Sequence, residues 1–347
     1  MKISKRFWPS SVLAIAVGLP ACTAPNPTGA GGAGGSPPVP ETPTYYRDVK
    51  VIIDANCTGC HKAGGVAPMP FENAEQVQPF ASAMSYAVEH RHMPPWMASP
   101  GCNEYEPDRS LSDRQIQIIR RWAEQGAPIG DPRDEPAPTP RPNSEMSRVD
   151  LRLSMPAAYT PRVRADDYRC FVLNWTPTAR KYITGIGVTP GVAPLVHHAI
   201  AYLIPPASAG FVRFADVLDP GPGYACPGGV TGGWITSWEP GGHGIDFPHG
   251  TGIAVEPGSV IVLQVHYNTL FATPSPDQSS VEFALADTTL TPARTLTWMN
   301  LDWWAGNMPI PANDPDVTHV YETTPSELNA TGSMRIHWAD IHMHTLG

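Results

Sequence analysis

Two cysteines and a histidine are spaced as covalent haem attachment requires. Cys57, Cys60 and His61 form the motif Cys-x-x-Cys-His. Two thiols on one helical turn can bond both vinyl groups of one porphyrin, and the following histidine can then bind the iron. A zinc half-site or a disulfide is the alternative, but zinc needs a second pair of ligands, and this segment contains no further Cys-x-x-Cys pair. The motif therefore predicts haem c bound through Cys57 and Cys60, with His61 as an axial ligand.

The second axial ligand of the haem is expected shortly after Val88, in the segment that contains Met93. Met93 precedes Pro94, which disfavours helical geometry at Met93 and favours an extended loop. We therefore predict Met93 as the ligand, with Met97, His92 and His90 as alternatives. A methionine would raise the reduction potential and favour electron transfer, whereas a second histidine would lower it.

Further histidines form three clusters in segments of two-residue periodicity. His342 and His344 are two residues apart, so on a strand they share a face and can chelate one ion. His197 and His198 are adjacent and would point to opposite faces unless the strand is bulged. His266 lies alone in a third apolar run. Imidazole-rich sites suit copper or zinc, and a haem in the same chain favours copper because copper changes oxidation state.

The segment 45–132 carries the spacing of three helices. Apolar residues recur at helical intervals in three stripes: Val49, Ile52, Ile53; Val77, Phe80, Met84, Ala87, Val88; Ile116, Ile119, Trp122, Ala123. The first helix is expected to end at Cys57. Ser112 and Gln115 form a capping box for the third helix, and Gly126 ends it. Three helices around this haem motif resemble a small class I cytochrome c, so an all-α domain is expected here.

After a linker at 133–148, which is rich in proline and charge, the period changes to two. Short β-rich runs are predicted at 168–173, 182–188, 196–203, 259–267 and 281–285. Glycine and proline clusters separate these runs. We therefore predict an all-β antiparallel sandwich or jelly roll over 149–290, which makes the chain a multidomain protein with an α-helical domain first.

The N-terminus has the features of an export signal. Basic residues precede an apolar run at 7–19, which is too short to span a membrane. The sequence Leu-Pro-Ala-Cys ending at Cys22 looks like a bacterial lipoprotein signal, in which the cysteine is acylated; simple cleavage nearby is the alternative. We predict a signal over 1–22, a flexible linker over 23–44, and a protein of the periplasm or outer membrane, attached to the membrane by lipid only.

Composition restricts the remaining classes of function. The 347 residues include 41 prolines and 31 glycines, and the formal net charge is -9. No basic cluster is present, so nucleic acid is not an expected partner. A serine hydrolase is not expected either, because the sequence contains no Gly-x-Ser-x-Gly motif.

The three histidine clusters, in this order and in these local sequences, resemble the copper type II, ascorbate-dependent monooxygenases, the family of peptidylglycine α-hydroxylating and dopamine β-monooxygenases. The resemblance implies that His197, His198 and His266 bind an electron-transfer copper. It also implies that His342 and His344, with a downstream methionine, bind an oxygen-activating copper. The implied reaction hydroxylates an aliphatic C–H bond of a small organic substrate with O2. Electrons would come singly from an ascorbate-like reductant or a redox protein, and the haem would pass them to the copper.

The resemblance carries further expectations. It implies a disulfide between Cys170 and Cys226, which suits an exported protein. The chain stops at Gly347, directly after the last histidine motif, so an incomplete second sandwich over 291–347 and a truncated protein are expected. Asp340 stands where peptide-amidating members carry an arginine that binds a substrate carboxylate, so Asp340 is a candidate substrate-adjacent residue and a carboxylate anchor is not expected.

A protein of another class remains an alternative. The chain can instead be a non-catalytic electron-transfer or copper-carrying cytochrome lipoprotein, with the β domain as a docking module. Copper content distinguishes the two hypotheses. Two coppers per full-length chain are expected of the monooxygenase, and one or none of the carrier.

Overall fold

The computed structural model describes eight segments of the chain. They are residues 37–96, 108–137, 146–242, 244–270, 272–288, 291–314, 317–328 and 332–339. The predicted signal with Cys22, the alternative ligand Met97, and the predicted site residues Asp340, His342 and His344 lie outside them. The chain divides into two compact units, Met1–Val49 with Pro79–Glu135 and Lys50–Gln78 with Pro136–Gly347.

The helices described before residue 136 are short. They are η1 (Tyr45–Val49), α1 (Lys50–Asn56), α2 (Ala74–Val77), η2 (Gln78–Phe80), α3 (Ala81–Glu89), α4 (Asp113–Glu124) and η3 (Pro132–Asp134). Helix α1 ends immediately before Cys57, as its apolar spacing predicts. The division into units assigns residues 50–78 and the later helices to different units. The all-α cytochrome-like domain over 45–132 therefore stays a prediction.

Helix α4 begins and ends as the sequence predicts. The Gln115 backbone N–H donates to Ser112 Oγ at 3.3 Å, and the Ser112 N–H donates to Gln115 Oε1 at 2.9 Å. Gly126 follows the helix with a φ of +81°, a left-handed conformation that favours glycine. The buried face differs in part from the predicted stripe. It consists of Ile118, Ile119 and Trp122, whereas Ile116 and Ala123 are half-buried.

The described β strands form two sheets. They are β1 (Leu151–Ser154), β2 (Asp166–Val172), β3 (Lys181–Thr189), β4 (Val196–Ile204), β5 (Tyr224–Ala225), β6 (Gly233–Trp238), β7 (Ile245–Asp246), β8 (Thr251–Val255), β9 (Val260–Asn268), β10 (Ser280–Ala286) and β11 (Thr291–Ala293). One sheet has the order β1-β10-β3-β8-β11, with β7 also paired to β3, and the other has the order β5-β2-β9-β4-β6. All five predicted strands are confirmed, as β2, β3, β4, β9 and β10. Strand β11 pairs in parallel with β8, so the first sheet is not wholly antiparallel.

The inner faces of the two sheets share one hydrophobic core. Ile186 and Phe283 contribute from the first sheet, and Phe171 and Leu263 from the second. Every second residue of β9 faces this core, so its other residues form the outer face of the second sheet. The chain is therefore a mainly β protein with a sandwich-like domain. Cys170 and Cys226 form the expected disulfide, which ties β2 to the residue after β5.

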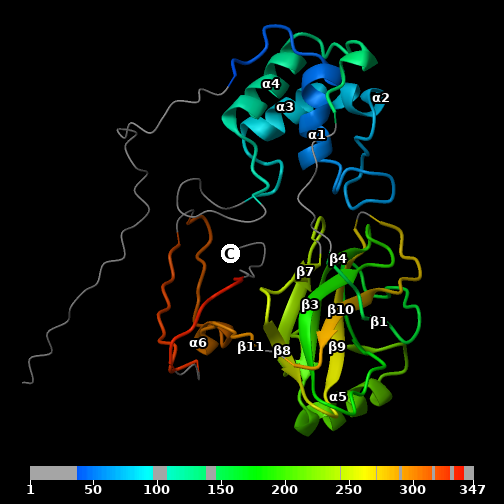
Figure 1. Cartoon of the computed structure of the whole chain (residues 1–347), viewed down its shortest axis with the longest axis vertical. Coiled ribbons are helices and arrows are strands. Elements are labelled where there is room, and N and C mark those ends of the chain that lie inside the picture. Colours follow the sequence, from blue (N-terminus) through cyan, green and yellow to red (C-terminus); the bar gives the residue numbers. More distant parts are fainter. Residues whose placement is uncertain are drawn as a thin grey trace, which may run out of the picture. The chain divides into compact units, whose positions relative to one another are not determined.

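Two helices accompany the sheets (Figure 1). Helix α5 (Pro206–Leu218), which the sequence did not predict, packs Ala209 and Val212 on the outer face of the second sheet. Helix α6 (Leu301–Trp304) is the only regular element in the described part of 294–339, and the predicted second sandwich stays a prediction. No helix in the segments that the structure describes is long and apolar enough to cross a membrane.

Candidate metal centre

A β-bulge in β4 turns two adjacent histidines to one face of the sheet. Val196 pairs with Tyr267 and His198 pairs with His266, so the register between β4 and β9 shifts by one residue at His197. Val196 and Ala199 consequently both face the inner core although they are three residues apart. The sequence predicts that His197 and His198 can share a face only if the strand is bulged, and the structure has this bulge.

The imidazoles of His197, His198 and His266 converge on the outer face of the second sheet. The Nδ1 atoms of His197 and His198 are 3.3 Å apart, and the Nδ1 atoms of His266 and His198 are also 3.3 Å apart. One ring nitrogen from each of the three residues lies within 4.8 Å of the others. In the described segments this is the only group of three or more histidine, cysteine or acidic residues whose ligand atoms gather in this way.

The spacing of these nitrogens fits a single metal ion. Two imidazole nitrogens bound to one ion at about 2.0–2.1 Å lie about 3.3–3.6 Å apart when the bond angle is between tetrahedral and trigonal. The observed separations of 3.3 Å match the lower end of that range. A donor set of three imidazoles without a thiolate suits copper or zinc. His266 is 5% exposed and His197 is exposed, so one side of the centre opens to solvent.

Residues of β2 and β9 fix the orientation of the His266 ring. His266 Nε2 lies 3.0 Å from Asp166 Oδ1, and because a carboxylate only accepts, Nε2 carries the proton. Nδ1 is then left with its lone pair towards the other two histidines. The Asn268 side-chain amide donates to the same carboxylate oxygen at 3.1 Å. Tyr168 stacks on the ring, with centroids 4.0 Å apart and planes 9° apart.

The predicted haem motif forms a tight turn after α1. The Cys57 N–H donates to the Ile53 carbonyl at 2.8 Å, and the His61 N–H donates to the Cys57 carbonyl at 2.9 Å. Cys57 and Cys60 are not joined by a disulfide. Burial, with smaller effects from Cys60 and Asp54, raises the pKa of Cys57 to about 12, so its thiol is protonated at neutral pH. Both cysteines are free of disulfide bonds, as thioether formation with a vinyl group requires.

The His61 ring is held in one orientation. Its Nδ1 lies 2.9 Å from the Met69 carbonyl, which can only accept, so Nδ1 is the protonated nitrogen and Nε2 is the possible ligand atom. Phe71 stacks on the ring at 4.2 Å with planes 7° apart. Burial lowers the pKa of His61, and the hydrogen bond to Met69 opposes this shift only in part. A neutral imidazole with a free Nε2 is what an iron ligand requires.

The predicted sixth ligand and its described alternatives lie beyond α3. Met93 follows the helix in an irregular segment and is 46% exposed. His90 caps α3, with its Nδ1 2.8 Å from the Tyr86 carbonyl, and its ring lies 5.8 Å from that of His92. Met93 and His61 belong to different units, so the choice of Met93 as ligand stays a prediction.

Comparisons with known proteins supply no family for this chain. No protein-family model matches the sequence, and no curated protein sequence matches it. The resemblance to copper monooxygenases thus stays a prediction.

The residues that orient the histidines were not predicted from the sequence. They are Asp166, Asn268, Met69 and Phe71. None of these residues has a sequence signal except Asp166, whose position two residues before Tyr168 places both on one face of β2.

Proposed function

We propose that the chain is an exported haem c and copper protein that works as a copper-dependent monooxygenase. The observation that carries the proposal is the convergence of the Nδ1 atoms of His197, His198 and His266 at ligand spacing. Copper bound there would supply one-electron transfer by changing between Cu(I) and Cu(II). The haem motif at Cys57, Cys60 and His61 supports a second one-electron carrier in the same chain.

The residues around the three histidines suit an electron-transfer site. Asp166 and Tyr168 fix the ring of His266, so the ligand geometry changes little when the charge of the site changes. His197 is exposed, which leaves the centre accessible to an ascorbate-like reductant or a redox protein. The buried position of His266 keeps solvent from the opposite side.

The hydroxylation itself rests on the predicted second site at His342 and His344. The proposed reaction converts an aliphatic C–H bond, O2, two electrons and two protons into an alcohol and one water. The haem or an external reductant supplies the two electrons one at a time. Asp340, near this site in sequence, is proposed to lie close to the substrate.

Copper analysis tests the metal part of the proposal. We expect two coppers per chain by mass spectrometry of the purified full-length protein, and one in its His266→Ala variant. His249→Ala is the matched control, because His249 is on another segment outside the cluster, and it should keep two. Unchanged copper content in His266→Ala, with circular dichroism showing an intact fold, would contradict the electron-transfer site.

Stopped-flow absorbance tests the role of the haem. The reduced, copper-loaded protein is mixed with O2 and candidate C–H substrates, and the haem bands are followed. We expect the haem to oxidise while the alcohol forms. Haem that stays reduced while product forms would remove the proposed electron path.

The exposure of His197 also favours the second candidate, a non-catalytic copper carrier. An open, three-imidazole site can release its ion to another protein more readily than a closed one. This function predicts at most one copper per chain, transfer of Cu(I) to a chelator or acceptor, and no O2-dependent product. Copper stoichiometry and product analysis together therefore separate the two functions.

A further inference from the structure

Helix α5 carries an apolar surface on the side that faces away from the sheet. Its large exposed side chains are Phe211 at 75%, Phe214 at 62%, Val217 at 81% and Leu218 at 67%. Intervals of three, four and seven residues place them on one side of the helix. The other side buries Ala209 and Val212 against the second sheet. The helix is thus apolar on both sides, and an apolar surface of this kind is usually covered.

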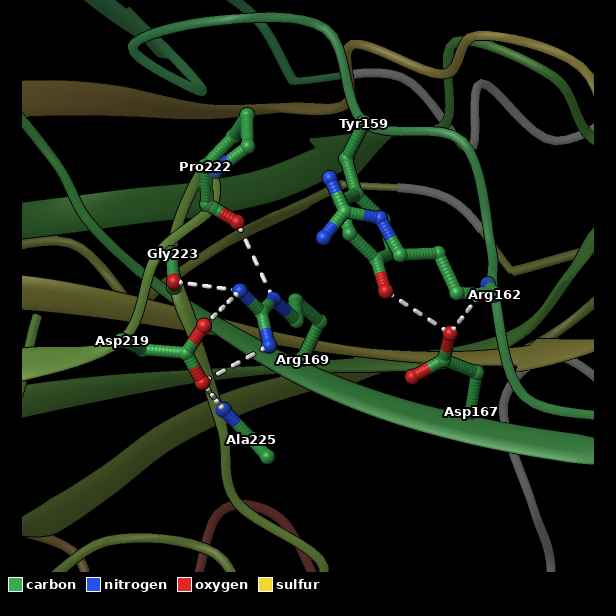
Figure 2. Close-up of polar contacts among 8 residues, drawn as sticks. All are labelled: Tyr159, Arg162, Asp167, Arg169, Asp219, Pro222, Gly223 and Ala225. Carbon is green, nitrogen blue, oxygen red and sulfur yellow. Dashed lines mark hydrogen bonds and ion pairs between the residues drawn. The ribbon is translucent and has the colours of Figure 1, made fainter.

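The charged groups next to this surface differ in how exposed they are. Arg213 is exposed beside the apolar side chains, and no ion pair of Arg213 occurs among the described residues. Asp216 is half-buried, and burial raises the pKa of its carboxyl. Asp219, directly after α5, accepts from the Arg169 guanidinium at 2.6 and 3.0 Å (Figure 2). Of these three groups, only Arg213 is exposed and outside the described ion pairs.

A cavity lies beside α5, where the exposed side of the helix meets its buried side. Its volume is about 460 Å³, and it lies between the helix and the segment 224–231. Most of its lining is apolar, including Phe211, Val212, Ala215 and Val230. Phe211 forms part of the wall and is also exposed, so the cavity lies next to the apolar surface of the helix.

We propose that the α5 surface, defined by Phe211, Arg213, Phe214, Val217 and Leu218, binds an anionic lipid bilayer. The four apolar side chains enter the acyl boundary, and the guanidinium of Arg213 stays at the level of the phosphates. The adjacent cavity can accept part of an acyl chain. A second copy of the chain is a poorer occupant, because it brings a second exposed Arg213 to the same apolar surface.

Bilayer binding by α5 is compatible with an accessible metal centre. The first residue of α5 lies beside the start of β9, since a Cβ at Gly258 would come 3.6 Å from Pro206 Cβ. His266 lies near the other end of β9, and none of the three histidines belongs to the α5 surface. The proposed lipid surface therefore does not depend on copper, and copper binding can fail or succeed independently of it. It agrees with the predicted lipid attachment at Cys22.

Vesicle flotation tests the proposal. A form that lacks residues 1–22, and therefore carries no acyl group on Cys22, is mixed with vesicles of phosphatidylethanolamine and phosphatidylglycerol at 3:1. We expect binding to these vesicles. The double variant Phe211→Ser/Phe214→Ser should lower the partition coefficient at least about tenfold. Leu270→Ser is the matched control, because Leu270 is 51% exposed on another segment, and it should bind as the parent does.

Two further measurements make the outcome decisive. Arg213→Gln should weaken binding to the anionic vesicles but not to vesicles of phosphatidylcholine alone. Circular dichroism and the thermal midpoint of each variant verify that the fold is intact. Equal binding by the double variant and the parent would overturn the proposal. The proposal would also be overturned if the parent does not bind vesicles and light scattering shows a dimeric parent and a monomeric double variant. The α5 surface would then contact a second copy of the chain.

Discussion

Asp166 controls which nitrogen of His266 can bind a metal. Its carboxylate accepts from His266 Nε2 at 3.0 Å, which leaves Nδ1 as the ligand atom. Losing such a partner weakens metal binding by about 10- to 100-fold in other metal sites. We predict a loss of this size in Cu(II) affinity for Asp166→Ala, measured by competition with a chelator. Asp166→Glu should recover part of the affinity, because it restores an acceptor.

A spectroscopic measurement separates this role from a general loss of structure. The Cu(II) electron paramagnetic resonance parameters should change in Asp166→Ala, because the ring of His266 is free to turn. Asp287→Ala is the control, since Asp287 is an exposed partner of Lys181 on another edge of the domain. A Cu(II) affinity and spectrum in Asp166→Ala equal to those of the parent would remove the assigned role.

Arg169 is a buried cation whose hydrogen bonds are met within the β domain (Figure 2). Its side chain is 7% exposed and donates to Asp219 and to the carbonyls of Pro222 and Gly223. Removing one partner of a buried ion pair leaves the other charge uncompensated. We therefore predict that Asp219→Ala lowers the free energy of unfolding by about 3–5 kcal/mol, measured by urea denaturation. Arg180→Ala, which breaks the exposed pair with Glu256, should cost at most about 1 kcal/mol.

The same pair predicts a dependence of stability on pH. The hydrogen bond from Arg169 is the main cause that lowers the pKa of the Asp219 carboxyl. A carboxyl with a lowered pKa in the folded state stabilises the protein fully above its ordinary pKa of about 3.9, and this contribution is lost as the pH falls through the lowered value. The difference in unfolding free energy between the parent and Asp219→Ala should thus be constant above about pH 5 and shrink below about pH 4. A difference that grows on acidification would contradict this assignment.

At the scale of elements, the sequence predicts the positions of the strands but not the β-bulge in β4. The two-residue period identifies β2, β3, β4, β9 and β10 because apolar side chains alternate across a half-buried sheet. The bulge at His197 could have been inferred from Val196 and Ala199, which are apolar at an interval that a regular strand does not allow on one face. Helix α5 was missed because large apolar side chains lie on its exposed side, where a surface helix usually carries polar residues. Asp166 was missed because its role depends on pairing between distant strands.

The disulfide links elements that are distant in sequence. Cys170 and Cys226 are 56 residues apart and tie β2 to the segment after β5. Closing a loop of this length in the unfolded chain corresponds to about 4 kcal/mol of stability. We predict that Cys170→Ala/Cys226→Ala lowers the free energy of unfolding by about this amount, measured by urea denaturation under oxidising conditions. Reductant should lower the stability of the parent and leave the double variant unchanged.

At the scale of the whole molecule, the two predicted cofactors belong to very different local structures. The haem motif is a short turn whose two cysteines and histidine fall within five consecutive residues, so their spacing alone predicts it. The three histidines of the metal centre come from two strands, and His266 is 68 residues after His198 in the sequence. Only the pairing of β4 with β9 brings these histidines together. From the sequence, they are predicted to form one site mainly because their motifs resemble those of the copper monooxygenases.

Copper should therefore stabilise one part of the chain selectively. The three histidines all lie in the unit that contains Pro136–Gly347, and a ligand stabilises the folded unit to which it binds. Free copper at about 100 times its dissociation constant should contribute about 2.7 kcal/mol. In differential scanning calorimetry we expect copper to raise the unfolding transition of the β domain. His266→Ala should reduce the rise, because only the predicted second copper site is then left, and His249→Ala should retain the full rise. A rise of equal size in His266→Ala would mean that copper binds elsewhere in the chain.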